Sequence, residues 1–185
     1  PIQYVDYSVW QRRWLEEGGV LARQLSYWRE KLAGVPESLD LPTDHPRPSV
    51  QSVAGATLEF GVEAALTARL KQLAGREGAT LYMVLLAVFK VLLHRYTGQE
   101  DVCVGSPIAN RQYGETAGLI GMFVNTLALR TRLEGQDTFT GLLSKVRTTC
   151  LEAYENQDAP FEKVVDALQL ERNLAVSPLF QVMLI

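Results

Sequence analysis

The sequence predicts a layered α/β sandwich, a fold in which helices pack against a mixed sheet. The first part of the chain shows helical periodicity alone, whereas the middle alternates between strand-like and helix-like segments. The composition, 47% hydrophobic and 21% charged, is typical of a globular protein. The length of 185 residues is enough for one core, or for one lobe of something larger.

Two amphipathic helices are expected before residue 33. Trp10 and Trp14 lie one helical turn apart, and a second apolar stripe follows the break at Gly18-Gly19. The second stripe consists of Leu21, Leu25, Trp28 and Leu32. Four prolines between residues 34 and 49 then predict an extended connector that lies over a surface.

The middle of the chain predicts strands and helices in alternation. Residues 56–60, 102–108 and 120–130 are typical of strands, and residues 62–75, 79–97 and 138–155 of helices. Thr80 is the candidate N-cap of the second helix, and Asp137 or Thr138 of the third. The apolar stretch from Leu81 to Leu93 is too short for a bilayer and is interrupted by Lys90, so a buried helix is expected there.

Two further elements are expected near the end of the chain. A short helix follows Pro160, with Phe161, Val164, Val165 and Leu168 on its apolar face. Residues 179–185 form an apolar run typical of a buried strand. Because this run stops without a polar exit turn, we expect the chain to be a piece of a larger domain.

Composition argues against several classes of function. A net charge of -3 leaves no basic field, so nucleic acid is not an expected partner. No signal peptide opens the chain and no stretch suits a bilayer, so no membrane association is expected and the predicted location is the cytoplasm. Cys103 and Cys150 are accordingly expected to be buried free thiols.

Generic catalytic motifs are absent from the sequence. It contains no phosphate-binding loop and no GxGxxG, HExxH, CxxC or GxSxG pattern, and no metal site is predicted. His45 lies in the proline-rich connector and His94 at the polar edge of the apolar helix. Neither has a carboxylate or nucleophile at a recognisable spacing, so a general base is expected to lie outside this chain.

Four short stretches, in order along the chain, resemble signature motifs of the condensation domains of nonribosomal peptide synthetases. Residues 4–10 (YVDYSVW) resemble YxDYAxW, and residues 120–127 (IGMFVNTL) with Arg130 resemble (I/V)GxFVNT(L/Q)xxR. Residues 156–162 (NQDAPFE) are similar to (H/N)QDxPFE, and residues 172–180 (RNLAVSPLF) to RNxxxxPLF. The resemblance covers essentially all 185 residues.

The resemblance implies a fold, a reaction and a set of partners. Condensation domains resemble chloramphenicol acetyltransferase, with two similar lobes around a tunnel. Carrier-protein domains deliver two thioesters on phosphopantetheine arms, and the acceptor amine attacks the donor thioester to form an amide bond. No cofactor is therefore expected to bind this chain directly. The expected partners are the donor and acceptor peptidyl carrier protein domains, the adjacent adenylation domain and the N-terminal lobe of the same domain.

The resemblance also places the chain within the domain. The HHxxxDG motif of the family, whose second histidine deprotonates or positions the amine, precedes the YxDYAxW stretch and is not contained in this sequence. Residues 1–185 are therefore expected to be part of one condensation domain, its C-terminal lobe truncated at both ends. No catalytic residue is expected in the chain, and no activity in isolation.

Two residues are implied to support the active site. Arg111 stands where the family has an arginine that pairs with the aspartate of HHxxxDG, so it is expected to be unpaired or wet here; the alternative is a solvent-facing loop arginine. Asn125 stands in an apolar strand and must be hydrogen-bonded. It either lines the tunnel or pins a neighbouring loop.

The other motif residues are interpreted as structural. Tyr4, Asp6, Tyr7 and Trp10 are expected to form a staple, with Trp10 in the core. Gly121 and Phe123 are expected to serve close backbone packing and the core. Asp158 and Pro160 predict the start of the short helix that carries Phe161, with the carboxylate as its cap. Arg172 and Asn173 belong to the closing motif.

Three alternatives remain beside a catalytic condensation domain. One is a degenerate relative that recruits partner enzymes to the assembly line. The HHxxxDG region outside this chain would mainly distinguish it, and the intact Asn125 and Arg111 positions favour the catalytic kind. Another is the sister epimerisation domain, which the intact FVNT and PFE stretches disfavour. The third, an unrelated α/β domain, would need four ordered matches by accident.

Overall fold

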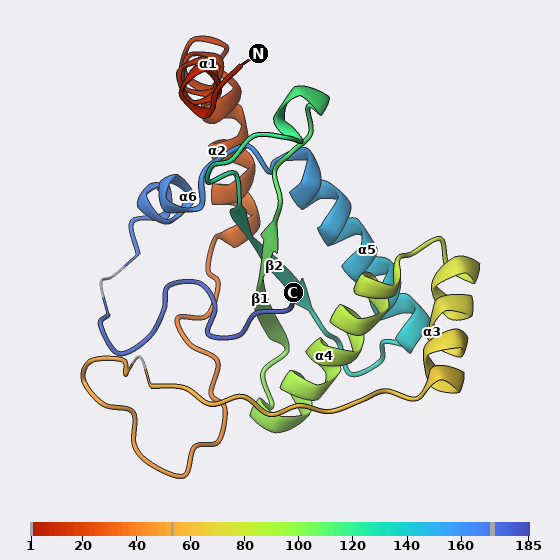
Figure 1. Cartoon of the computed structure of the whole chain (residues 1–185). Coiled ribbons are helices and arrows are strands. Elements are labelled where there is room, and N and C mark those ends of the chain that lie inside the picture. Colours follow the sequence, from red (N-terminus) through yellow and green to blue (C-terminus); the bar gives the residue numbers. More distant parts are fainter. Residues whose placement is uncertain (1, 53, 171–172) are drawn as a thin grey trace.

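A two-stranded antiparallel hairpin lies at the centre of the computed structural model, which describes residues 2–52, 54–170 and 173–185. β1 (Asp101–Ile108) pairs with β2 (Asn125–Arg132) along their whole length, from Asp101 opposite Arg132 to Ile108 opposite Asn125. Helices α4 (Leu81–Thr97) and α5 (Phe139–Glu155) pack on one side of the hairpin, and α2 (Val20–Leu32) and α6 (Phe161–Leu168) lie on the other (Figure 1). The predicted α/β class is confirmed.

The two predicted N-terminal helices are present. α1 (Tyr4–Glu17) ends at Gly18, and Gly19 takes the left-handed conformation (φ 64°) that lets α2 begin in a new direction. The connector that follows runs without regular structure to α3 (Ala64–Arg76). The connector is held in place at Leu39, whose side chain is buried and whose backbone N–H donates to Gln181 Oε1 at 2.6 Å.

The predicted helix ends are confirmed where a side chain or a glycine defines them. Thr80 caps α4, because its hydroxyl accepts the N–H of Met83, and Gly98 ends that helix with φ 71°. Thr138, rather than Asp137, caps α5 by accepting the N–H of Gly141. Among the described residues no single helix is long and apolar enough to cross a membrane. Helices α3 and α4 reach that length and apolar character only when taken together, and they are bent by 104° where they meet.

The strand predictions are confirmed only in part. Residues 102–108 lie in β1, but β2 begins at Asn125 instead of residue 120, because Ile120 and Met122 project into solvent in the preceding loop. The strand predicted at 56–60 is wrong. Its Leu58 and Phe60 are 88% and 87% exposed, and among the described residues no strand pairs with it. Alternating apolar and polar residues do not form a strand unless a neighbouring strand completes their backbone hydrogen bonds.

The C-terminal run forms a bridge instead of the expected strand. Residues 179–185 make one isolated parallel bridge between Gly105 and Met183. Gly105 N–H donates to Val182 O, and its carbonyl accepts from Leu184 N–H, both at 3.0 Å. The bridge nevertheless places the buried Phe180 ring directly over Gly105.

The core between the hairpin and α4 contains a charged residue. Lys90 is fully buried, and its Nζ donates to Val102 O at 3.0 Å and Leu129 O at 2.6 Å, one carbonyl from each strand. Burial lowers the pKa of the Lys90 ammonium from 10.5 to about 8. Lys90 therefore joins α4 to both strands through hydrogen bonds.

Candidate functional site

The candidate site lies at the end of the hairpin where β1 stops at Ile108 and β2 begins at Asn125. The intervening loop, residues 109–124, contains a short 3₁₀ turn (Gly114–Thr116) and carries Arg111. The segment between α5 and α6, residues 156–160, and the start of α1 meet this loop. Three of the four sequence motifs therefore converge on one end of the hairpin.

Asn125 fastens the segment between α5 and α6 to the start of β2. Its Nδ2 donates to the carbonyl oxygens of Gln157 at 2.7 Å and Ala159 at 2.9 Å. Its Oδ1 accepts the N–H of Phe161 at 3.0 Å, which satisfies the first free N–H of α6. These contacts are those of a side chain that pins a neighbouring loop. Because both amide hydrogens are used, only the remaining acceptor capacity of Oδ1 is free for a substrate, and the tunnel-lining role stays a prediction.

Asp158 does not cap α6, so that prediction is wrong. Pro160, the residue that precedes the helix, has no side chain that can cap it, and the first N–H of α6 donates to Asn125 instead. The Asp158 carboxylate instead accepts hydrogen bonds from two glutamines, from Gln24 Nε2 to Oδ2 at 2.8 Å and from Gln112 Nε2 to Oδ1 at 3.2 Å. Glu162 does lie in the first turn of α6, where a carboxylate suits the helix dipole.

Helix α2 holds the same segment from the other side. Gln24 is 1% exposed, and its Oε1 accepts the N–H of Ala159 at 2.7 Å. One turn further along, Trp28 Nε1 donates to Asn156 O at 2.9 Å. Sequence reasoning missed Gln24, although a polar residue in the apolar stripe formed by Val20, Gln24 and Trp28 was a usable signal.

Arg111 lies on the surface of the loop. Its guanidinium carbon is 4.0 Å from the centroid of the Phe123 ring, in cation–π geometry, and Nη1 donates to Thr116 O. Within the described part of the chain, no carboxylate forms an ion pair with it. This placement fits both the expectation that Arg111 is unpaired or wet and the alternative of a solvent-facing loop arginine, so its pairing with another lobe stays a prediction.

An aromatic cluster joins α1 to the loop. Phe123 is buried, with its ring centroid 5.2 Å from that of Tyr4 and 4.7 Å from that of Tyr7. Tyr4 Oη donates to Met122 O at 2.8 Å, and its ring lies where a β-carbon on Gly121 would be. Gly121 and Phe123 thus serve close packing and the core, as predicted.

Within this cluster, the environment of the Tyr7 hydroxyl changes its acidity. Burial, and after it the nearby Asp158 carboxylate, raises the pKa of Tyr7 above its ordinary value. The hydroxyl is therefore neutral at physiological pH, so the cluster brings no second negative charge to Asp158.

Trp10 is not a core residue. It is 41% exposed, stacks on Trp14 at 5.4 Å between centroids and meets the edge of Tyr113 at 5.1 Å. The prediction was wrong because Trp10 lies on the outer face of α1, beside exposed Val5 and Val9, along an open groove of about 540 Å³. Asp6 is structural, since its Oδ2 accepts the N–H of Gln3 at 2.8 Å and closes a capping box.

Arg130, the last residue of the FVNT motif, has a structural role at the opposite end of the hairpin. Its guanidinium pairs with Asp101 at 2.6 Å and donates to the carbonyls of Lys31, Ala33 and Gly34 at the end of α2. Burial would raise the pKa of Asp101, but hydrogen bonds from Arg130 and then Arg132 outweigh it and lower the pKa. Arg130 is thus a C-terminal cap supplied by another element.

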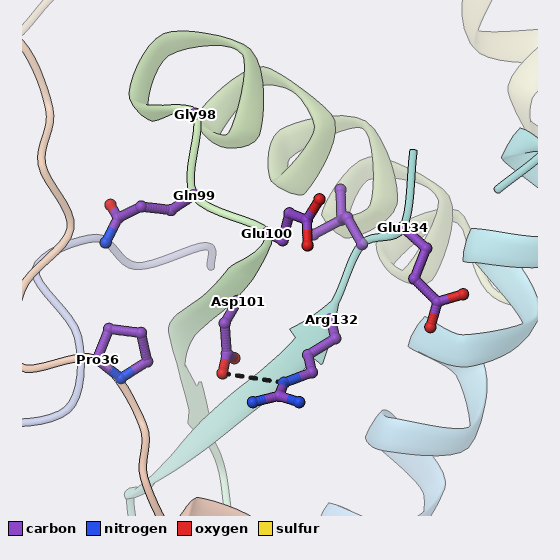
Figure 2. A pocket seen from close by; sticks show the side chains of 8 residues that line it. Pro36, Gly98, Gln99, Glu100, Asp101, Arg132 and Glu134 are labelled. Carbon is purple, nitrogen blue, oxygen red and sulfur yellow. Dashed lines mark hydrogen bonds and ion pairs between the residues drawn. The ribbon is translucent and has the colours of Figure 1, made fainter. Parts of the chain in front are cut away.

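A cavity also lies at this opposite end. It has a volume of about 660 Å³ and is lined by Pro36, Glu100, Asp101, Arg132 and neighbouring residues. Figure 2 shows the carboxylate of Asp101 turned toward Arg132, with Glu100 and Glu134 at the rim. It lies one strand length, roughly 23 Å, from Asn125. Neither Arg111 nor Asn125 contributes to it.

Asn173 is exposed, and its Oδ1 accepts the N–H of Ala175 at 2.9 Å in a local turn, whereas Arg172 lies outside the described residues. His94 Nδ1 lies 2.9 Å from Gln99 O at the end of α4, which agrees with a helix-end role. Cys103 and Cys150 are buried free thiols, as expected. Within the described residues no group of His, Cys, Asp and Glu side chains is arranged to hold a metal ion.

Comparisons with known proteins converge on one family. The family model described as Condensation domain matches residues 1–185. The chain is 59% identical over 184 residues to a subunit of the linear gramicidin synthase of Brevibacillus parabrevis, with 100% of this chain but only 4% of that subunit covered.

Solved structures give the same result. The chain matches the X-domain from teicoplanin biosynthesis, in its complex with OxyB, with a TM-score of 0.91 and 29% identity over 98% of this chain and 41% of that one. It also matches a four-domain nonribosomal peptide synthetase bound to AMP and glycine, with a TM-score of 0.85 and 29% identity over 86% of this chain and 12% of that one.

Proposed function

The chain belongs to the condensation-domain family, and from that premise we propose that it is part of a domain that forms peptide bonds in nonribosomal peptide synthesis. In this reaction the amine of an acceptor aminoacyl group attacks the carbonyl carbon of a donor thioester. The carbon–sulfur bond breaks, the thiol leaves and an amide forms. Phosphopantetheine enters as the arm of each thioester substrate, carried by a partner domain.

One observation carries the proposal: the motif stretches at 4–10, 120–127 and 156–162 form one connected unit. Asn125 of the second stretch holds the third, and Tyr4 of the first holds the backbone of the second. Arg111 emerges from the same unit toward solvent. A unit of this kind can orient a loop rigidly, which is the contribution that a reaction between two tethered substrates needs most.

We assign the general base to a part of the domain that this chain does not contain. Its two histidines, His45 and His94, lie in the connector and at the end of α4, away from Arg111 and Asn125. In the proposal, Arg111 supports the loop that carries the HHxxxDG motif. The exposed apolar side chains of Val9, Ile120 and Met122 support a second lobe facing this end of the hairpin.

The partners in the proposal are a donor and an acceptor peptidyl carrier protein domain and an adjacent adenylation domain. The likeness to the gramicidin synthase subunit and to a four-domain synthetase supports them, because the chain spans 4% and 12% of those longer chains. Two buried free thiols suit a reducing compartment, which supports a cytoplasmic location.

The test uses the synthetase that contains this chain, with donor and acceptor carrier proteins loaded with aminoacyl groups. We expect dipeptide formation by the whole domain and none above background by residues 1–185 alone. In the whole domain, Arg111→Ala should lower the rate about 100-fold, since breaking one side of a buried ion pair costs several kcal/mol. Arg132→Ala, an exposed arginine at the far end of the hairpin, is the control. Equal losses from both, or turnover by the isolated chain, would contradict the assignment.

A second function has one observation in its favour. The X-domain that this chain resembles with a TM-score of 0.91 was solved in complex with another protein, OxyB. A recruiting module would bind a partner enzyme and leave amide formation to other domains. If the intact domain gives no dipeptide but retains an enzyme of the same assembly line on a size-exclusion column, recruitment is the better assignment.

A further inference from the structure

Asp158 connects two parts of the molecule that are far apart in sequence. One carboxylate oxygen, Oδ2, accepts from Gln24 on α2, 134 positions away, and the other, Oδ1, accepts from Gln112 in the loop, 46 positions away. Gln112 is the residue directly after Arg111. The carboxylate therefore links a buried residue of the scaffold to the segment that carries Arg111.

The scaffold side of this connection is rigid. Gln24 is 1% exposed, its Oε1 accepts from Ala159 N–H at 2.7 Å, and its Nε2 donates to Asp158 at 2.8 Å and, more weakly, to Glu155 O at 3.5 Å. Loss of these hydrogen bonds by a buried amide would destabilise the protein, so the orientation of the Gln24 side chain is fixed. With Oδ2 held in this way, Oδ1 has a fixed direction toward the loop.

The loop side depends on this contact. The other hydrogen bonds described for residues 109–119 stay within the loop: from Arg111 to Thr116, from Thr116 to Tyr113, and the backbone bonds of the 3₁₀ turn. Ring contacts of Tyr113 and Arg111 add packing, but they do not fix a direction. The bond from Gln112 to Asp158 is thus the directional link between this part of the loop and the helices.

We propose that Asp158 is a positioning residue for peptide-bond formation: held by Gln24, it sets the place of Arg111 through Gln112. The inference rests on the proposed function, in which Arg111 contacts the other lobe. Asp158 itself touches no reacting atom, so its effect must pass through Arg111. If the effect of Asp158 on the rate depends on Arg111, Asp158 positions Arg111; if it does not, Asp158 contributes only to the stability of the fold.

The experiment reverses the hydrogen bond in the intact synthetase. Gln112→Glu sets two carboxylates against each other, which should lower kcat for dipeptide formation about tenfold with little change in KM for the carrier-bound substrates. Because Gln112 is exposed, this variant should keep the thermal midpoint of the wild type. Gln72→Glu, the same change at an exposed position of α3, is the matched control and should keep full activity.

The reversal is completed by Asp158→Asn. In the double variant the new amide donates to the new carboxylate, so kcat should return to within about threefold of wild type. In an Arg111→Ala background, Gln112→Glu should lower kcat less than about twofold further, because the group it positions is gone.

Three results would overturn the inference: full activity of Gln112→Glu, no recovery in the double variant, or the same tenfold loss with and without Arg111. If the wild-type synthetase itself forms no dipeptide, the proposed function has failed, and the two failures remain distinguishable.

Discussion

Replacing Lys90 with methionine tests whether a buried charge determines how the stability of this fold responds to pH. Methionine has a similar length and fills the volume between α4 and the hairpin, but it cannot carry a proton. It removes the donor that Val102 O and Leu129 O share. The exposed Lys71→Met on α3 provides a matched control.

The magnitude follows from the pKa of Lys90, which burial lowers from 10.5 in the ordinary case to about 8. Between these two values the unfolded chain binds more protons than the folded chain, so the free energy of unfolding rises with pH. From pH 7 to 9 the rise amounts to about 1.3 kcal/mol for a group with this pKa. Below pH 7 Lys90 is protonated in both the folded and the unfolded chain, so its contribution to the free energy of unfolding no longer changes with pH.

The two buried thiols respond to pH in the opposite direction. Burial raises the pKa of Cys103 from 9.0 to about 12 and that of Cys150 from 9.0 to about 11, so as the pH approaches 9 the unfolded chain loses protons that the folded chain keeps. The thiols therefore lower the free energy of unfolding as the pH rises, which opposes the effect of Lys90. Because both thiols are present in every variant, the difference between the wild type and Lys90→Met isolates the lysine.

The assay is urea unfolding followed by the fluorescence of the three tryptophans, at pH 7, 8 and 9. Over this range the free energy of unfolding of the wild type and of Lys71→Met should rise by about 1.3 kcal/mol relative to that of Lys90→Met. Groups common to all three proteins cancel in the comparison. Parallel stability curves for the wild type and Lys90→Met would refute the reasoning.

Three further substitutions have expected outcomes in the same unfolding assay. Gly105→Ala places a methyl group inside the ring of Phe180, and should lower the free energy of unfolding by about 1–3 kcal/mol; a neutral result would mean that the C-terminal bridge is not formed in solution. Gly121→Ala displaces the first tyrosine of α1, so it should also lower the free energy of unfolding by about 1–3 kcal/mol. The displaced ring should become more accessible to fluorescence quenchers, and unchanged quenching would contradict the packing. Asn125→Asp keeps the acceptor for α6 but loses two donated hydrogen bonds, so it should cost about 2–3 kcal/mol, whereas Asn173→Asp, which keeps its one local bond, should cost less than about 0.5 kcal/mol; equal costs would contradict the role of Asn125.

Most of the helices could be predicted because the information for a helix is local. Periodic apolar positions, the Gly18-Gly19 break, Thr80 and Gly98 each act within about one turn of where they stand, and the observed helix ends agree with them. The family could also be identified, because each motif is a short run of adjacent residues.

The strands were less predictable because a strand is defined by its partner. Residues 56–60 alternate between apolar and polar side chains, yet they remain unpaired among the described residues, and residues 120–124 form an apolar run that does not join β2. The pairing of Ile108 with Asn125 decides where β2 begins. No property of either segment alone contains that register.

The sequence by itself determined the helices, the class of fold and which residues belong to a motif. The tertiary structure decided what those residues touch: it buried Lys90 under the hairpin, turned Trp10 to the surface and directed Asp158 to Gln24 and Gln112 instead of to its own helix. The physical reason is the same in each case. A polar group takes the partner that packing brings within about 3 Å, and packing is settled by the whole chain rather than by its neighbours in sequence.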